Sequence, residues 1–125
     1  MNVVDSSAWL EYFANGPNAT FFAAAVEKTD KLIVPTLSIF EVFKRVLQQR
    51  DENDALQAIA LMHQGTLVEL DASTAVRAAR LSIEHRLPLA DSIILATART
   101  YEATLWTQDA DFEGLPAVRY RKRKP

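Results

Sequence analysis

Two aspartates in this 125-residue sequence stand directly after segments that should form buried strands. Asp5 follows the β-branched pair Val3-Val4, and Asp109 closely follows the apolar run Thr104–Thr107. Both runs predict short strands of an α/β sheet. In open α/β sheets, ligands bind at the carboxyl ends of the strands. The two carboxylates are therefore expected at the edge of the sheet that is suited to a functional site.

Two further acids lie in helices that should be largely buried. Glu41 falls on a narrow polar stripe of an otherwise apolar helix, together with Ser38, Arg45 and Gln48. Asp91 lies in the first turn of the very apolar segment Ala90–Ala98. Each acid also has an interpretation without function. Glu41 could pair with Arg45 one turn along, Asp91 could complement the helix dipole, and Asp109 could stabilise a turn.

Gathering these carboxylates in one place requires compensation of their charge. Carboxylates a few ångström apart repel each other, and at least one of them takes up a proton unless a cation is present. Mg²⁺ and Mn²⁺ prefer such hard oxygen ligands. The chain has no cysteine, and its two histidines, His63 and His85, have poor ligand spacing, which argues against a structural zinc site. A carboxylate cluster with Mg²⁺ suits phosphate chemistry. The sequence has no glycine-rich phosphate loop, which argues against a P-loop nucleotidase.

Strand-like and helix-like segments alternate along the chain. This alternation predicts parallel pairing and a three-layer α/β/α sandwich with a mostly parallel central sheet of four to five strands. The expected strands are Val3–Val4, Leu32–Val34, Leu67–Leu70, Thr104–Thr107 and, at the edge, Ala117–Tyr120. The expected helices are Ala8–Phe13 with Ser6 or Ser7 as N-cap, Ala19–Glu27, one from the N-cap Thr36 to Gln49, one that opens with the acidic run Asp51–Asp54 and continues through Ala55–His63, one from the N-cap Ser73 to about Arg86, and Ala90–Ala98.

Composition and charge indicate one domain, residues 1–120, followed by a basic tail, residues 121–125. The length and the 49% hydrophobic content suit a single core. The net charge is −2, and five positive charges at residues 119–124 leave about −7 for the rest of the chain. The basic end could contact phosphates, or it could be a solvated, frayed terminus. No signal peptide or membrane span is visible, and a cytoplasmic protein without membrane contact is expected.

The candidate acids lie in four short motifs along the chain. The motifs are Val3-Val-Asp-Ser-Ser7, Ser38-Ile-Phe-Glu-Val42, Leu87-Pro-Leu-Ala-Asp-Ser-Ile-Ile-Leu-Ala-Thr-Ala98 and Leu105-Trp-Thr-Gln-Asp-Ala-Asp-Phe112. In this order they resemble the PIN-domain ribonucleases, and most closely the VapC-type toxins of toxin–antitoxin modules, and the resemblance covers essentially the whole chain.

This resemblance implies an acidic pocket with one or two Mg²⁺ or Mn²⁺ ions and metal-dependent endonucleolytic cleavage of RNA. Asp5 and Asp91 would be the most direct metal ligands, and Glu41 would be a further ligand or would orient the attacking water. Asp109 would hold a second metal, a role that Asp111 could share or replace. Ser7 and Thr107 match positions where a hydroxyl supports the site.

The resemblance also implies two protein partners. One is a second copy of the chain in a homodimer, and the other is a cognate antitoxin whose C-terminal segment lies in a groove and blocks the acidic pocket. The apolar residues Trp9, Leu10, Tyr12 and Phe13 of the first helix could serve such a surface or could belong to the core.

Two alternative functions are weaker. A phosphatase or phosphotransfer domain with Asp5 as nucleophile would be expected to have a second acid at position 7, where this chain has Ser7. The second alternative is a catalytically silent PIN-like binding module that acts through protein partners. Loss of one or more of the four acids would favour this alternative, but all four are present.

Overall fold

Five short strands form one fully parallel sheet in the computed structural model, which describes all residues from 1 to 125. The strand order is β3-β2-β1-β4-β5, and each neighbouring pair is parallel. The predicted α/β fold is therefore confirmed, with five strands. The strands are β1 (Asn2–Val4), β2 (Leu32–Pro35), β3 (Thr66–Val68), β4 (Thr104–Thr107) and β5 (Val118–Tyr120).

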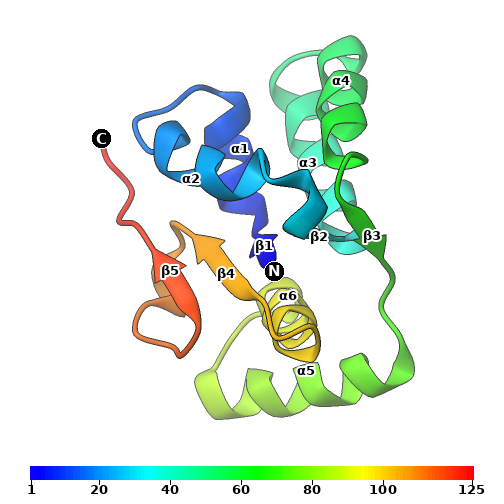
Figure 1. Ribbon diagram of the computed structural model, residues 1–125, viewed down its shortest axis with the longest axis vertical. Helices are drawn as coiled ribbons and strands as arrows, with labels where there is room; N and C mark the ends of the chain where they lie inside the picture. The colour runs from blue at the N-terminus through cyan, green and yellow to red at the C-terminus, as the bar shows by residue number, and fades with distance from the viewer.

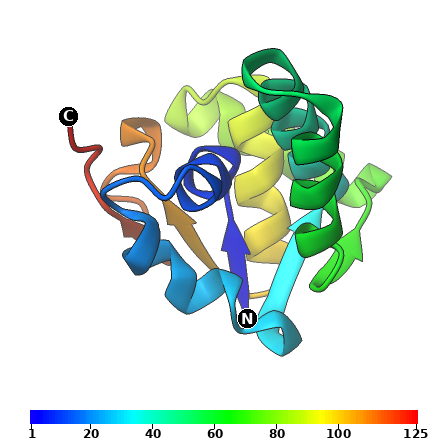
Figure 2. The ribbon, with the colours of Figure 1, turned by 90° about the horizontal axis from the view of Figure 1, so that it is seen from above.

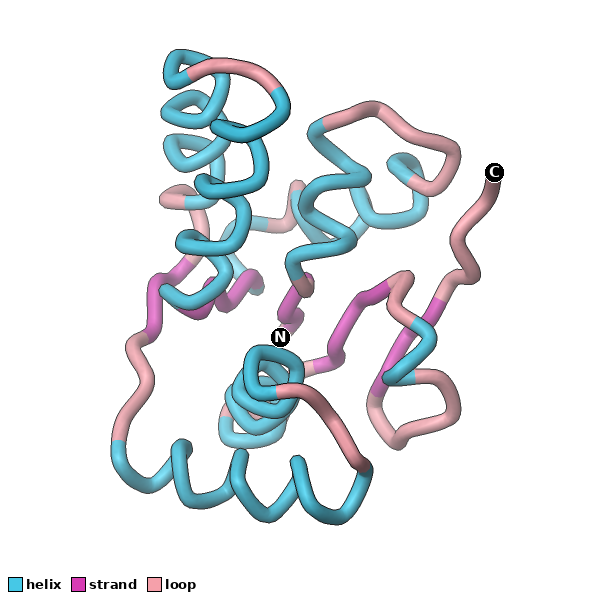
Figure 3. Tube along the Cα trace, turned by 180° about the vertical axis from the view of Figure 1, so that it is seen from behind, coloured by secondary structure: helices cyan, strands magenta, loops and turns pink.

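Six α-helices cover the two faces of the sheet and make the three layers of the sandwich (Figure 1). Helices α1 to α4 lie on one face, and α5 and α6 lie on the other (Figures 1 and 3). The helices are α1 (Ser6–Phe13), α2 (Ala19–Val26), α3 (Thr36–Gln49), α4 (Glu52–Met62), α5 (Ala72–His85) and α6 (Leu89–Thr100). Two single 3₁₀ turns, η1 (Thr29–Lys31) and η2 (Ala110–Phe112), complete the regular structure. None of the helices has both the length and the apolar character needed to cross a bilayer.

Successive residues of the central strands face opposite cores. Val4 and Trp106 pack with the helices on the α1–α4 side, whereas their neighbours Val3 and Leu105 pack with α5 and α6. This alternation follows from the pleat of a strand, which turns neighbouring side chains to opposite faces. Because helices cover both faces, the central strands β1, β2 and β4 are mostly apolar on both faces rather than alternately polar, as is typical of parallel sheets.

The helix starts differ from the predicted N-caps at three places. Helix α1 is capped by Asp5, not by Ser6 or Ser7, and the Asp5 carboxylate accepts from the Ala8 N–H at 3.0 Å. Helix α3 begins at Thr36 itself, after Pro35, without a side-chain cap. Asp71 rather than Ser73 caps α5. The hydroxyl residues lie inside the first turn of each helix, because a carboxylate or a fixed proline one to two residues earlier ends the preceding extended segment.

The third strand and the end of the chain also differ in detail from expectation. β3 covers Thr66–Val68 rather than Leu67–Leu70. The tail after β5 does not leave the body of the protein at once. The Arg121 N–H donates to the Thr107 carbonyl at 3.0 Å, and the Lys122 carbonyl accepts from the Asn18 side-chain amide at 3.0 Å. A fully frayed terminus is therefore wrong for this part of the tail.

Candidate metal centre

The neighbouring carboxyl ends of β1 and β4 form the centre of the site (Figure 2). The strand that follows β1 in sequence, β2, pairs on one side of β1, and β4 pairs on its other side. The chain direction across the sheet thus reverses at β1, and ligands of open α/β sheets bind at such a reversal. Asp5 directly follows β1, and Asp109 lies two residues after the end of β4.

Asp5 is buried and held by three hydrogen bonds. One carboxylate oxygen accepts from the Ser7 hydroxyl at 2.8 Å and from the Ala8 N–H, and the other accepts from the Thr107 hydroxyl at 2.7 Å. Thr107 is itself buried, and its oxygen accepts from the Asp109 N–H at 2.9 Å. The two hydroxyl residues expected to support the site, Ser7 and Thr107, therefore both contact Asp5.

Asp91, Asp109 and Asp111 bring their carboxylates together. One oxygen atom of each lies within 4.8 Å of the others. Asp91 comes from the first turn of α6, and the other two come from the loop after β4 and from η2. Asp109 also caps η2, because one of its oxygens accepts from the Asp111 N–H at 2.9 Å. The turn-stabilising role of Asp109 and its place in the acidic group are thus compatible.

The electrostatics of the site show that the acids interact. The pKa of Asp91 is raised to about 7, first by burial and then by the negative charges of Asp109, Asp5, Asp111 and Glu41, in that order of importance. Burial likewise raises the pKa of Asp5 to about 6, with a smaller contribution from Asp109, although the bonds from Thr107, Ser7 and Ala8 lower it. These are the effects expected when carboxylates converge in a partly desolvated place.

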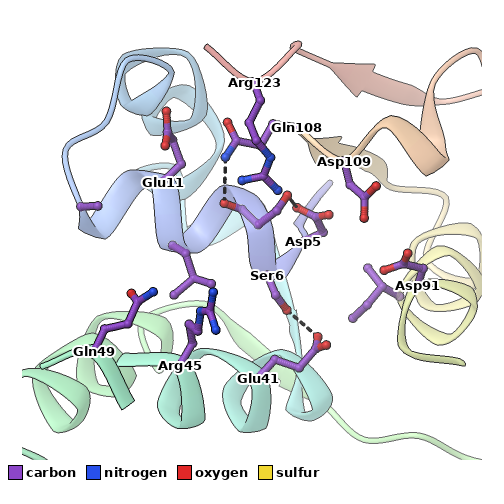
Figure 4. A pocket seen from close by; sticks show the side chains of 14 residues that line it. Asp5, Ser6, Glu11, Glu41, Arg45, Gln49, Asp91, Gln108, Asp109 and Arg123 are labelled. Atoms are coloured by element: carbon purple, nitrogen blue, oxygen red, sulfur yellow. Dashed lines mark hydrogen bonds between the residues drawn. The ribbon is translucent and has the colours of Figure 1, made fainter. Parts of the chain in front are cut away.

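Glu41 approaches the same place from the opposite wall, on α3. Its carboxylate accepts from the Ser6 hydroxyl at 2.5 Å. No ion pair joins Glu41 to Arg45, so the interpretation as a local helix pair is wrong. Figure 4 shows Asp5, Glu41, Asp91 and Asp109 around one cavity, to which they come from different elements. The sequence positions predicted to converge therefore do so.

The cavity has a volume of about 480 Å³ and includes residues that were not predicted. Its additional polar lining is Ser6, Glu11, Arg45, Gln49, Gln108 and Arg123. On α3 the polar residues that face the cavity are Glu41, Arg45 and Gln49, each four residues after the one before. The predicted stripe ended in Gln48 instead of Gln49. The same spacing from Ser7 would have indicated Glu11. No local pattern indicates Arg123, which reaches the cavity only because the tail folds back.

The side chains present suit a hard divalent cation. Five of the side chains that line the cavity offer carboxylate oxygens, and burial raises the pKa of two of them, Asp5 and Asp91, as expected for carboxylates without a bound cation. Asp91, Asp109 and Asp111 are close enough to share one ion, and neither oxygen of Asp91 is engaged in a hydrogen bond. The set contains no thiolate and no imidazole, so Mg²⁺ or Mn²⁺ fits it better than structural zinc.

Comparison with known proteins gives one family match. The sequence model of the family described as PIN domain matches residues 3–118, which is nearly the whole chain. Among curated proteins, no sequence matches.

Solved structures with the same fold come from several bacteria. A chain of a toxin–antitoxin complex from Klebsiella pneumoniae is 24% identical, with a TM-score of 0.79 over 95% of this chain and 96% of that one. VapC20 of Mycobacterium tuberculosis, described as a toxin that cleaves the sarcin–ricin loop, is 16% identical, with a TM-score of 0.77 over 93% and 95%. A chain of VapBC2 from Rickettsia felis, bound to a DNA fragment from the promoter, is 12% identical, with a TM-score of 0.75 over 97% of this chain and 97% of that one. At these identities the likeness establishes a common fold.

Proposed function

The chain belongs to the PIN domain family, and on this basis we propose that it is a metal-dependent endoribonuclease and the toxin of a toxin–antitoxin pair. The observation that carries the proposal is the convergence of Asp5, Glu41, Asp91 and Asp109 on one cavity. The structures that share the fold support the toxin assignment, since several of them are toxin–antitoxin complexes.

In this proposal each acid has its own task. Asp91, Asp109 and Asp111 would hold the cation together with Asp5. When bound, Mg²⁺ or Mn²⁺ would neutralise the phosphate and lower the pKa of a bound water. Glu41, on the facing wall, would orient the attacking water for in-line hydrolysis of the phosphodiester. The Ser7 and Thr107 hydroxyls fix the Asp5 carboxylate, so that it does not turn away from the cavity.

The two alternative functions find less support. Both oxygens of Asp5 accept hydrogen bonds, which suits a fixed ligand better than the nucleophile of a phosphatase. A binding module without catalysis would not need this group of acids around Asp91, whose pKa is raised to about 7 by burial first and then by the charges of its carboxylate neighbours.

The test is cleavage of total RNA by the purified chain in Mg²⁺, with the cut sites mapped. We expect Asp5→Asn and Asp91→Asn each to lower the rate at least about a hundredfold, as losses of groups that act on the reacting water or its metal do. Asp30→Asn, which removes an exposed acid in η1, is the matched control and should cleave like the wild type. Retained cleavage by both site variants would reject the assignment.

We further propose a cognate antitoxin that binds in an apolar groove next to the cavity. The groove has a volume of about 450 Å³ and is formed by α1, α3 and α4, with Phe13, Val46 and Leu61 among its apolar residues. Leu10, Ala14 and Gln49 line both the groove and the acidic cavity. An amphipathic segment in the groove could therefore continue into the cavity and block it.

A homodimer completes the proposal. The two most exposed large apolar side chains are Ile83 at 82% and Leu89 at 78%, at the end of α5 and the start of α6. Val76, also exposed, lies two helical turns before Ile83 on α5. Val76 and Ile83 are seven residues apart and so share one face of α5, and exposed apolar side chains grouped on one helix face often mark a protein interface.

A further inference from the structure

The basic C-terminal tail is exposed to solvent, but it passes beside the acidic cavity, and its residue Arg123 lines that cavity. Asn18, which is 1% exposed, donates from its side-chain amide to the Lys122 carbonyl and, at 3.1 Å, to the Gln108 side chain. Gln108 and Arg123, the residue directly after the anchored Lys122, both line the cavity. Asn18 thus links the backbone of the tail to Gln108, a residue of the cavity lining, and Figure 4 shows Gln108 and Arg123 among the residues that line the cavity.

The other arginines of this segment are already engaged. The Arg119 guanidinium stacks on the Trp106 ring at 4.5 Å from its centre, and that of Arg121 stacks on Phe21 at 4.2 Å. These contacts reinforce the docking of the tail. Arg123, by contrast, forms no ion pair and no hydrogen bond, although it borders a cavity rich in carboxylates.

An RNA strand that enters this cavity meets predominantly negative charge. The cation that the acids would hold compensates the charge at the reacting phosphate, and the phosphates on either side need their own partners. Guanidinium groups bind phosphate oxygens in a bidentate manner and keep their charge at any ordinary pH. Arg45 supplies such a group on the α3 wall, and Arg123 supplies one on the wall formed by the tail.

We propose that Arg123 binds a backbone phosphate of the RNA substrate beside the acidic cavity, so that the docked C-terminal tail forms one wall of the substrate groove. This inference rests on the proposed nuclease function and deepens it. Asn18 is a positioning residue in this arrangement, because it holds the backbone of the tail without reaching the cavity itself.

Binding can be measured apart from cleavage in the Asp91→Asn background. The probe is a fluorescently labelled single-stranded RNA oligonucleotide of mixed sequence, titrated by anisotropy in Mg²⁺ at several salt concentrations. We expect Arg123→Ala to weaken binding roughly tenfold, which corresponds to one charged hydrogen-bonding contact. The slope of log K against log salt should fall by about 0.7, the value for one phosphate contact on a single strand.

The matched control is Lys124→Ala, which removes the same charge one residue further on, outside the cavity lining. It should change binding less than twofold. Asn18→Ala should weaken binding in the same direction as Arg123→Ala, and Arg123→Lys should recover part of the loss. In otherwise wild-type protein, Arg123→Ala should raise KM for RNA cleavage while kcat changes little, because the contact is made before the reaction.

Three results would overturn the inference. Equal effects of Arg123→Ala and Lys124→Ala on RNA binding would show only a general charge effect. Faster RNA cleavage by Arg123→Ala would indicate that the tail inhibits the enzyme. If no form of the protein bound RNA, Arg123 would have no RNA phosphate to bind. Failure of the proposed function gives a different result. In that case RNA would bind with the expected dependence on Arg123, yet the wild type would not cleave it.

Discussion

The Asp5 and Asp91 side chains carry the clearest consequence of the site for stability. Both pKa values, about 6 and about 7, lie above the ordinary value of 3.8 that applies in the unfolded chain. Between about pH 4 and pH 7 the native state therefore binds more protons than the unfolded state. The free energy of unfolding must then fall as the pH rises through this window.

The size of this loss can be measured by urea unfolding in EDTA at pH 5 and pH 7.5. For the buried Asp5 alone we expect roughly 1 to 2 kcal/mol, from about 1.4 kcal/mol for each pH unit over which only the native state holds the proton. Asp91 adds a loss in the same direction, moderated by its partial exposure to solvent. The variant Asp91→Asn should lose less stability over this range, because its side chain does not ionise.

Saturating Mg²⁺ should reverse most of the effect, since a bound cation favours the ionised carboxylates of the native state. The melting temperature should rise more at pH 7.5 than at pH 5, and by much less in Asp91→Asn. Stability that is independent of pH between 5 and 7.5 in EDTA, or no rise with Mg²⁺ at pH 7.5, would contradict a converged acid cluster.

At the scale of the elements, the turn between α4 and β3 depends on Gly65. A Cβ atom there would lie 2.8 Å from a methyl carbon of Val34 and 3.0 Å from the carbonyl oxygen of Leu32. Both residues belong to β2, which is paired in the sheet and cannot move aside easily. We expect Gly65→Ala to lower the free energy of unfolding by roughly 1 to 3 kcal/mol, the usual cost of overpacking. Urea unfolding measures it.

Gly16→Ala is the comparison. The nearest atoms to its added Cβ are those of the Glu11 carboxylate, which can turn aside at the cost of its hydrogen bond from the Asn18 N–H, so the effect on stability should be smaller than that of a clash with backbone. Because Gly65 precedes β3, at the amino end of the strands, the Mg²⁺-induced rise in melting temperature should stay the same in Gly65→Ala. Equal destabilisation by the two substitutions would show that the backbone of β2 gives way more easily than the sheet pairing suggests.

The elements also show what the sequence could and could not predict. Apolar runs such as Leu32–Val34 and Thr104–Thr107 are short, uninterrupted and bounded by helical patterns, so strands and their parallel pairing were predictable. The N-cap of α1 was missed because Asp5 has two roles, and one carboxylate both caps the helix and faces the cavity. The acids Asp5 and Asp109 were found because each follows a strand. Arg123 was not, since its position depends on the distant anchor Asn18.

At the scale of the whole molecule, the surfaces proposed for the antitoxin and for the second copy lie on different layers. The apolar groove belongs to α1, α3 and α4, whereas Val76 and Ile83 lie on α5, the outer helix of the opposite layer (Figures 1 and 3). The two associations should therefore be separable by substitution. A charge placed on an interface disfavours association because it is desolvated without a partner.

We expect the wild type to have twice the 14.0 kDa chain mass in light scattering, and Val76→Glu with Ile83→Glu to give the monomer. This variant should still copurify with the proposed antitoxin. Leu61→Glu, whose side chain lines the groove and is 44% exposed, should keep the dimer and lose the partner. All three side chains are exposed, so the fold should survive, which circular dichroism checks.

A dimer that persists in the α5 variant would place the interface elsewhere, and a partner retained by Leu61→Glu would exclude the groove. Loss of both associations in either variant would mean that the partner binds only the assembled dimer, which the separation of the two layers argues against.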